Sequence, residues 1–253
     1  MMTPKSDVHR VAQLVSKYKA TAAVIPSTRL QSLAGEMRHF GIRLSSIRRL
    51  GASGSVLSEA AYSVILSAFD GVECLVNAYA LTEAMGFLSS PSVHDARGTD
   101  VGFPAPWAQI KVVDEQTQQR LGANQTGEIC FRTPSMMKEY YKKPKETAEI
   151  FDEDGWCKSG DAGFYDGDGR LHIVQRLKEM IKCMDNQVVP AELEDLLLTE
   201  HSEEISEVAV VGLPQPHYGE APAALAVPQG YDSGRDYGSL ADLAERMKAT
   251  IAG

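Results

Sequence analysis

The sequence predicts an α/β protein: a partial doubly wound α/β layer plus a small β-rich subdomain, followed by a truncated α+β C-terminal domain. Three observations lead to this fold class. Strand-like and helical patterns alternate over roughly the first hundred residues, turn-separated short strands follow, and a second mixed pattern begins after Arg176. Alternation of strands and helices is typical of a parallel sheet, and short strands between turns indicate antiparallel pairing.

The first part of the chain, residues 1–97, is expected to be a partial α/β subdomain. Apolar side chains at helical spacing, or in short apolar runs, mark each of its elements. Helices are expected at 8–19, at 28–39 and after the N-cap residue Ser58, and strands at 22–25, 47–50 and 72–76.

Two further regions follow. Residues 98–176 predict a β-rich part of the same large domain, and residues 177–253 predict a separate α+β domain. The β-rich strands are expected at 109–113 and 127–131 and in a hairpin, 163–165 with 171–174, and the last region is expected to hold a helix from Pro190, strands at 208–211 and 223–227, and a helix at 240–251.

Composition excludes several classes of function. The chain has 253 residues, of which 43% are hydrophobic and 23% charged, as in an ordinary globular protein. A net charge of -9 argues against binding to nucleic acid. No apolar run approaches the roughly 18 residues that span a bilayer. The 4 cysteines form no CxxC pair and the 6 histidines are dispersed, so neither a disulfide framework nor a zinc cluster is expected.

A small-residue turn, Gly51-Ala-Ser-Gly54-Ser55, is predicted between a strand and a helix. Small side chains at the carboxyl end of a sheet let a flat ring approach the backbone. The alternative is a tight connection with no ligand.

A second motif, Ala78-Tyr79-Ala80-Leu81-Thr82-Glu83, is expected just after a strand. Its hydroxyl groups can donate to a phosphate, and the Glu83 carboxylate can hold Mg²⁺ opposite that phosphate. The alternative makes Tyr79 a core residue and Glu83 a solvated charge at the start of a helix.

A third motif, Ser159-Gly160-Asp161, is interpreted as a polar turn before the hairpin. A carboxylate there can accept hydrogen bonds from both hydroxyls of a ribose. The alternative is an Asp that bonds to its own backbone. Arg176 offers charge-assisted hydrogen bonds, or is simply an exposed charge at a strand end.

Taken in order, these motifs resemble the adenylate-forming superfamily of AMP-forming acyl-CoA synthetases and beetle luciferases, over about Val11 to Val227. The resemblance also rests on Gly155-Trp156 and on Val211-Gly-Leu-Pro214. It implies a role for each matching residue. Ser53, Gly54 and Ser55 would form the adenine-contacting turn, and Tyr79 would stack on adenine. Thr82 would contact phosphate, and Glu83 would support Mg²⁺. Asp161 would hold the ribose hydroxyls with help from Arg176, and Lys182 would face the site during thioester formation.

The activity that the resemblance implies is that of an ATP-dependent acid–CoA ligase working through acyl-AMP. ATP or AMP and Mg²⁺ would be bound, coenzyme A would be the co-substrate, and Thr82, Glu83 and Lys182 would take part in catalysis. The partners would be a carboxylic acid and a nucleotide. The resemblance places such enzymes in the cytoplasm or the peroxisome, although this chain carries no targeting signal, and it leaves the acid and the oligomeric state open.

The sequence also departs from the family pattern. It lacks the upstream Ser/Thr/Gly-rich phosphate loop and the downstream Pro-Lys-x-x-x-Gly-Lys motif, so the chain is expected to be truncated at both ends. Ala78 and Ala80 replace glycines, which would strain the backbone if either needed a positive φ. Asp185-Asn186 stand where the family has Gly-Tyr or Gly-Phe. The alternatives are therefore a non-catalytic AMP-binding pseudoenzyme or fragment product, or luciferase-like oxidation in a full-length parent.

Overall fold

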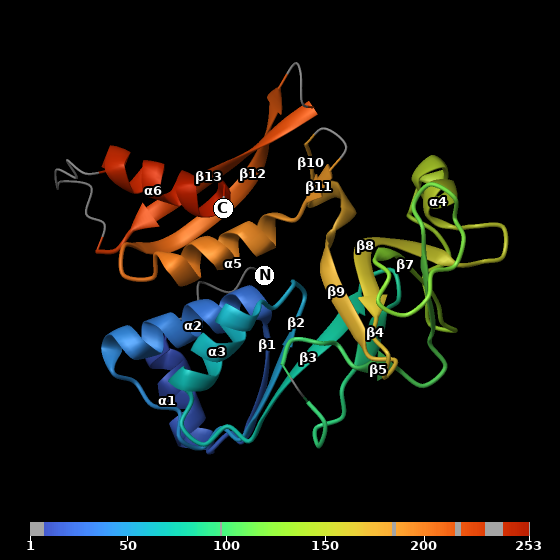
Figure 1. The fold of residues 1–253 in the computed structure, drawn as a ribbon. Helices are drawn as coiled ribbons and strands as arrows, with labels where there is room; N and C mark the ends of the chain where they lie inside the picture. Colours follow the sequence, from blue (N-terminus) through green and yellow to red (C-terminus); the bar gives the residue numbers. More distant parts are fainter. Residues whose placement is uncertain (1–7, 97, 184–185, 216–218, 231–239, 253) are drawn as a thin grey trace. The chain divides into compact units, whose positions relative to one another are not determined.

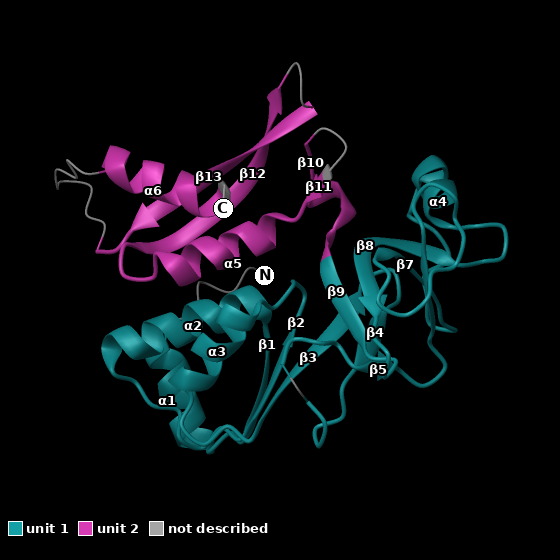
Figure 2. Ribbon diagram, viewed as in Figure 1, with its two compact units in different colours: residues 1–174 teal, residues 175–253 magenta. Residues whose placement is uncertain are grey.

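The computed structural model of the protein describes residues 8–96, 98–183, 186–215, 219–230 and 240–252 (Figure 1). The chain divides into two compact units, residues 1–174 and 175–253 (Figure 2). Each unit is described by itself. Among the described residues, no helix combines the length and apolar character needed to cross a membrane.

Unit 1 begins with a five-stranded sheet whose strands lie in the order β1-β2-β3-β4-β5. The first three strands are parallel, and the last two run antiparallel to their neighbours. The strands are β1 (Ala22–Pro26), β2 (Arg49–Ser53), β3 (Cys74–Leu81), β4 (Gly86–Ser90) and β5 (Phe103–Pro104). The parallel part matches the predicted α/β layer, and β4 and β5 had no counterpart in the prediction.

Three helices pack beside the parallel strands (Figure 1), namely α1 (Val8–Tyr18), α2 (Ser27–Phe40) and α3 (Glu59–Ala68). Leu30 of α2 and Ile65 of α3 are fully buried in one core with Leu50 of β2 and Leu75 of β3. Alternation along a strand turns every second side chain away from that core, which leaves Val24 74% exposed. The three predicted helices are confirmed.

The predicted N-cap of α3 is confirmed in atomic detail. Ser58 has an extended backbone, and its side-chain oxygen accepts a hydrogen bond from the backbone N–H of Ala61. This bond satisfies one of the N–H groups that the first turn of a helix leaves without an intrahelical partner.

The second half of unit 1 is an antiparallel sheet in the order β6-β7-β8-β9. Its strands are β6 (Gln109–Val113), β7 (Gly127–Arg132), β8 (Cys157–Tyr165) and β9 (Leu171–Arg176), and α4 (Pro144–Ile150) lies between β7 and β8 in the chain. Unit 1 ends at residue 174, so the last two residues of β9 are counted with unit 2. The predicted hairpin closes where Asp166 N–H donates to the Arg170 carbonyl over 3.0 Å. Buried Phe131 and Ile129 of β7 share a core with Tyr79 of β3, which joins the two sheets.

Unit 2 holds a four-stranded sheet in the order β11-β10-β13-β12. Its core contains Ile181, Leu197 and Ile205, all at most 2% exposed. The elements are a 3-10 turn η1 (Leu177–Glu179), the strands β10 (Ile181–Cys183), β11 (Asn186–Val188), β12 (Ile205–Gln215) and β13 (Gly219–Pro228), and the helices α5 (Pro190–Glu200) and α6 (Leu240–Ala252). The predicted helices and the two long strands are confirmed, whereas β10 and β11 had not been predicted. Asp185 lies outside the described residues.

The two parallel strands that carry the first two motifs are placed later in the chain than predicted. Strand β2 runs from Arg49 to Ser53, so Gly51, Ala52 and Ser53 are strand residues and only Gly54 and Ser55 lie beyond the strand. The small side chains were misinterpreted as a turn. A Cβ on Gly51 would lie 3.2 Å from a methyl carbon of Val24, so the small residue fits a crowded strand.

Strand β3 extends to Leu81, so Tyr79 lies inside a strand and not after one. Alternate side chains of β3 are buried through its whole length, and this burial continues the strand past the predicted end. Neither Ala78 nor Ala80 has a positive φ, because both are extended strand residues. The strain considered for these alanines is therefore absent.

The third motif is also part of a strand. Asp161 lies within β8, where the sequence had predicted a turn. The turn-like feature is confined to Gly160, whose φ of 71° is left-handed. Strand β8 pairs with β7 through Lys158 on one side of this motif and Ala162 on the other, and the register shifts between them. Pairing on both sides keeps the motif within the strand, and its local preference for a turn appears as this irregularity.

Candidate functional site

The centre of the candidate site is a hydrogen bond between two residues 82 positions apart. The Tyr79 hydroxyl donates to Oδ2 of Asp161 over 2.6 Å, and both residues are at most 8% exposed. Tyr79 belongs to the core that joins the two sheets of unit 1. This placement matches the alternative in which Tyr79 is a core residue, and it brings together two residues that the sequence had linked only through a resemblance.

Local contacts within and beside β8 fix Asp161. The Asp161 N–H donates to the Ser159 hydroxyl over 3.0 Å, and the Gly160 N–H donates to the Glu128 carboxylate over 3.3 Å. Glu128 is buried, and this burial raises the pKa of its carboxyl group. No chemistry was predicted for Glu128 from the sequence, but its hydrogen bond from Gly160 makes it a neighbour of the site.

The buried hydroxyl of Ser27 is hydrogen-bonded to the turn of Gly54 and Ser55. Ser27 is 2% exposed, and its Oγ lies 3.3 Å from both the Ser53 and the Ser55 carbonyl oxygens. Gly54 has a φ of 90°, a conformation that favours glycine. Ser53 pairs with Ala78 in the sheet, so this turn lies beside the strand of Tyr79. Ligands of α/β sheets usually bind at these carboxyl ends of parallel strands.

Thr82 and Glu83 lie in the turn that connects β3 to β4. No helix begins there, so the alternative of a helix-start charge for Glu83 is wrong. Thr82 is exposed. Glu83 is half-buried, and its Oε1 accepts a 2.6 Å hydrogen bond from the Tyr140 hydroxyl. Tyr140 was not identified from the sequence, and no local pattern there marks it as a partner of Glu83.

Two of the expected site residues belong to unit 2. Arg176 ends β9, and Lys182 is an exposed residue of β10 whose backbone N–H donates to the Glu220 carboxylate over 2.8 Å. Their predicted roles toward a ligand remain proposals.

The carboxylate oxygens of Glu83 suit one kind of metal ion, Mg²⁺. Among the residues that the structure describes, no three His, Cys, Asp or Glu side chains come together as a metal cage. Mg²⁺ does not need such a cage, because it commonly uses one or two carboxylates together with substrate phosphates and water. The single carboxylate of Glu83 fits this requirement.

The chain is similar in sequence to one protein family and to several known proteins. The sequence profile of the AMP-binding enzyme family matches residues 1–141. A 4-coumarate–CoA ligase 1 of Glycine max is 35% identical over 232 residues, which cover 90% of this chain and 78% of that relative. The chain therefore belongs to the AMP-binding enzyme family.

The chain is also similar to a second curated protein and to a solved structure. A luciferin 4-monooxygenase of Luciola mingrelica is 35% identical over 230 residues, covering 90% of this chain and 41% of the relative. The structure of an amide bond synthetase from Marinactinospora thermotolerans superposes with a TM-score of 0.78 at 27% identity, over 97% of this chain and 48% of that one. The chain thus spans less than half the length of several proteins that it matches.

Proposed function

We propose that this chain supplies the nucleoside-binding part of an ATP-dependent, AMP-forming acid–CoA ligase. The observation that carries the proposal is the buried hydrogen bond between Tyr79 and Asp161, beside the turn of Gly54 and Ser55. Membership of the AMP-binding enzyme family and similarity to a 4-coumarate–CoA ligase support it.

Each residue of the site has a defined task in this proposal. Asp161 accepts hydrogen bonds from the ribose hydroxyls, and the bond from Tyr79 fixes the orientation of its carboxylate. The turn of Gly54 and Ser55 leaves room for the adenine ring. Thr82 donates to a phosphate oxygen, and Glu83 would hold Mg²⁺, which supplies charge stabilisation to the phosphates when bound.

The proposed chemistry has two steps. A carboxylate oxygen of the acid attacks the α-phosphorus of ATP, the bond to the bridging oxygen breaks, and pyrophosphate leaves. The thiol of coenzyme A then loses its proton and attacks the acyl carbonyl, and AMP leaves. We assign two residues of unit 2 to this chemistry. Arg176 would help to hold the ribose, and Lys182 would act in the second step.

A second candidate is favoured by the luciferin 4-monooxygenase, which is as similar to this chain as the CoA ligase is. In this alternative the adenylate is oxidised by oxygen and is not passed to a thiol. Both candidates need the same nucleoside site. Light emission or thioester formation from an added acyl-adenylate distinguishes them.

The test of the shared site is calorimetric titration with AMP and with 2′-deoxy-AMP. Asp161→Ala is expected to weaken AMP binding by about 1–3 kcal/mol, because the ribose hydroxyls lose a charged acceptor. The variant should bind the two nucleotides equally, whereas the wild type should prefer AMP. Glu153→Ala, which changes an exposed carboxylate of the same unit, is the matched control. Equal AMP affinity in wild type and Asp161→Ala would reject the ribose role.

A further inference from the structure

The turn that carries Glu83 is clamped by residues 135–140. Tyr140 donates its hydroxyl to Glu83 Oε1 over 2.6 Å, although the two residues are 57 positions apart. The Met137 N–H donates to the Glu83 carbonyl over 2.8 Å. The Ser135 hydroxyl donates to the Ala84 carbonyl, also over 2.8 Å. Both the backbone and the side chain of Glu83 are thus held by one segment.

Tyr140 is itself fixed by the start of α4. Its backbone N–H donates to the Thr147 hydroxyl over 3.0 Å, and that hydroxyl donates in turn to the Lys143 carbonyl over 2.7 Å. The next residue, Tyr141, has the same side chain but is 81% exposed. The environment of Tyr140, and not its residue type, sets it apart.

We propose that Tyr140 is a positioning residue that holds Glu83 in place for the divalent cation of a bound nucleoside triphosphate. The inference rests on the proposed function. The phenol O–H takes one lone-pair site on Oε1 and leaves Oε2 without this donor, so Glu83 would hold the cation with a carboxylate whose orientation is already fixed. The bond also removes rotamers that a half-buried glutamate could otherwise adopt.

The strength of the effect follows from how Mg²⁺ is held. A cation with a single protein carboxylate depends on the orientation of that carboxylate, because substrate phosphates and water supply its other ligands. Hydrogen-bond partners of metal ligands typically change metal affinity by about 10–100-fold when they are removed. AMP carries neither a triphosphate nor the cation that accompanies it, so its binding should not involve Tyr140.

The experiment compares Tyr140→Phe with Tyr141→Phe in the full chain. Phenylalanine removes only the hydroxyl, and Tyr141→Phe makes the same change at an exposed neighbour. ATP affinity is measured by calorimetry with Mg²⁺ and with EDTA, and AMP affinity is measured separately. We expect Tyr140→Phe to reduce the Mg²⁺-dependent gain in ATP affinity by about 10-fold. Its AMP affinity should remain that of the wild type, and Tyr141→Phe should change neither.

A double-mutant cycle tests whether Tyr140 acts through Glu83. Glu83→Gln keeps an oxygen that can accept the Tyr140 hydrogen bond but removes the charge that the cation needs. In that background, adding Tyr140→Phe should have no further effect on the Mg²⁺ dependence. If Tyr140→Phe lowers the melting temperature, its AMP affinity distinguishes a structural loss from a positioning role. A purely structural loss would weaken AMP binding as well as the Mg²⁺-dependent gain in ATP affinity.

The possible outcomes separate the inference from the proposed function. A full Mg²⁺-dependent gain in Tyr140→Phe would overturn the positioning role and leave the nucleotide site standing. AMP binding by a wild type that shows no Mg²⁺ effect on ATP would do the same. A folded wild type that binds neither nucleotide would reject both.

Discussion

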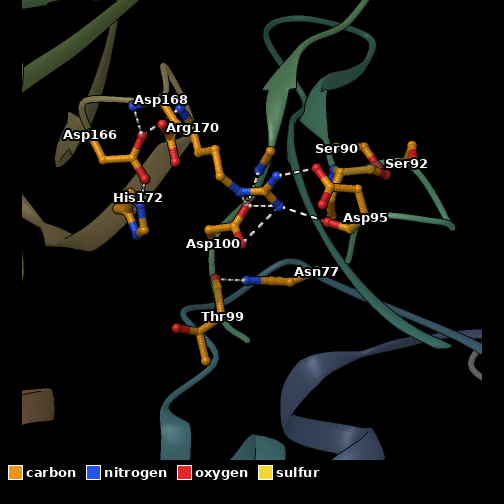
Figure 3. Close-up of polar contacts among 12 residues, drawn as sticks. Asn77, Ser90, Ser92, Asp95, Thr99, Asp100, Asp166, Asp168, Arg170 and His172 are labelled. Carbon is orange, nitrogen blue, oxygen red and sulfur yellow. Dashed lines mark hydrogen bonds and ion pairs between the residues drawn. The ribbon is translucent and has the colours of Figure 1, made fainter. Parts of the chain in front are cut away.

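Replacement of Arg170 by Met should strongly destabilise unit 1. Arg170 is 7% exposed and reaches between two acidic residues (Figure 3). Its Nε and Nη2 donate to the two carboxylate oxygens of Asp100 over 3.0 and 3.1 Å. Its Nη1 donates to the Asp95 carboxylate over 2.6 Å. Asp100 also accepts a 2.8 Å bond from the Gly102 N–H.

The expected magnitude comes from the burial of Asp100. Its side chain is 4% exposed, so removal of Arg170 leaves a buried carboxylate without its cation. Loss of one partner of a buried ion pair costs about 3–5 kcal/mol. The side chain of Asp95 is 35% exposed, and solvent screening makes its share of this loss less than about 1 kcal/mol. For a protein of this size, the total corresponds to a fall in melting temperature on the order of 10 °C.

Calorimetry and urea denaturation measure the effect. Arg43→Met is the matched control, since Arg43 pairs with Asp70 where both side chains are more than half exposed. That variant should lose less than about 1 kcal/mol. Adding Asp100→Asn to Arg170→Met should recover part of the loss, because the amide still accepts from Gly102 without a charge. An Arg170→Met protein that melts within about 2 °C of wild type would refute the reasoning.

Two other changes test the packing of unit 1. Gly102→Ala should cost about 2 kcal/mol or more in unfolding free energy, because Gly102 has a φ of 67° and a Cβ there would overlap the Pro91 backbone; an unchanged urea midpoint would contradict this. Burial raises the pKa of both Cys130 and Cys157 to about 12. At pH 8 only about one in 10⁴ of each thiol should be ionised. The test uses a variant in which the other two cysteines are replaced by serine. A disulfide reagent should label this variant only after it unfolds, because the thiolate is the reactive form. Rapid labelling of the native variant would show that these thiols are not buried. Since the folded-state pKa is higher than the unfolded-state pKa, both thiols stabilise the fold below about pH 8.5, and this contribution is lost as the pH rises toward 12.

Much of the fold could be predicted from local patterns. The helical spacing at 8–19 and 240–251 gave helices within one or two residues of their observed bounds. Ser58 predicted an N-cap that forms as expected. Helix periodicity and capping depend on side chains a few positions apart, so a single sequence contains the needed information.

The strand bounds near the site were predicted less well. Gly51 to Ser53 and Ser159 to Asp161 carry small and polar residues that favour turns, yet both stretches lie within strands. Gly51 to Ser53 pair with β3, whereas Ser159 to Asp161 lie where the register between β7 and β8 shifts. Strand formation depends on neighbours that are distant in the chain, and such pairing overrides local propensity. The resemblance draws attention to these motifs but says nothing of the strands in which they lie.

The sequence by itself determined the fold class, the family and the order of the motifs, because these follow from local periodicity and from residue identity. Only the tertiary structure decided which side chains meet. The hydrogen bonds of Tyr79 with Asp161 and of Tyr140 with Glu83, and the burial of Arg170 between Asp95 and Asp100, join segments separated by 57 to 82 residues. Such contacts depend on sheet register and loop paths, which the whole core fixes together, so no short stretch of sequence specifies them.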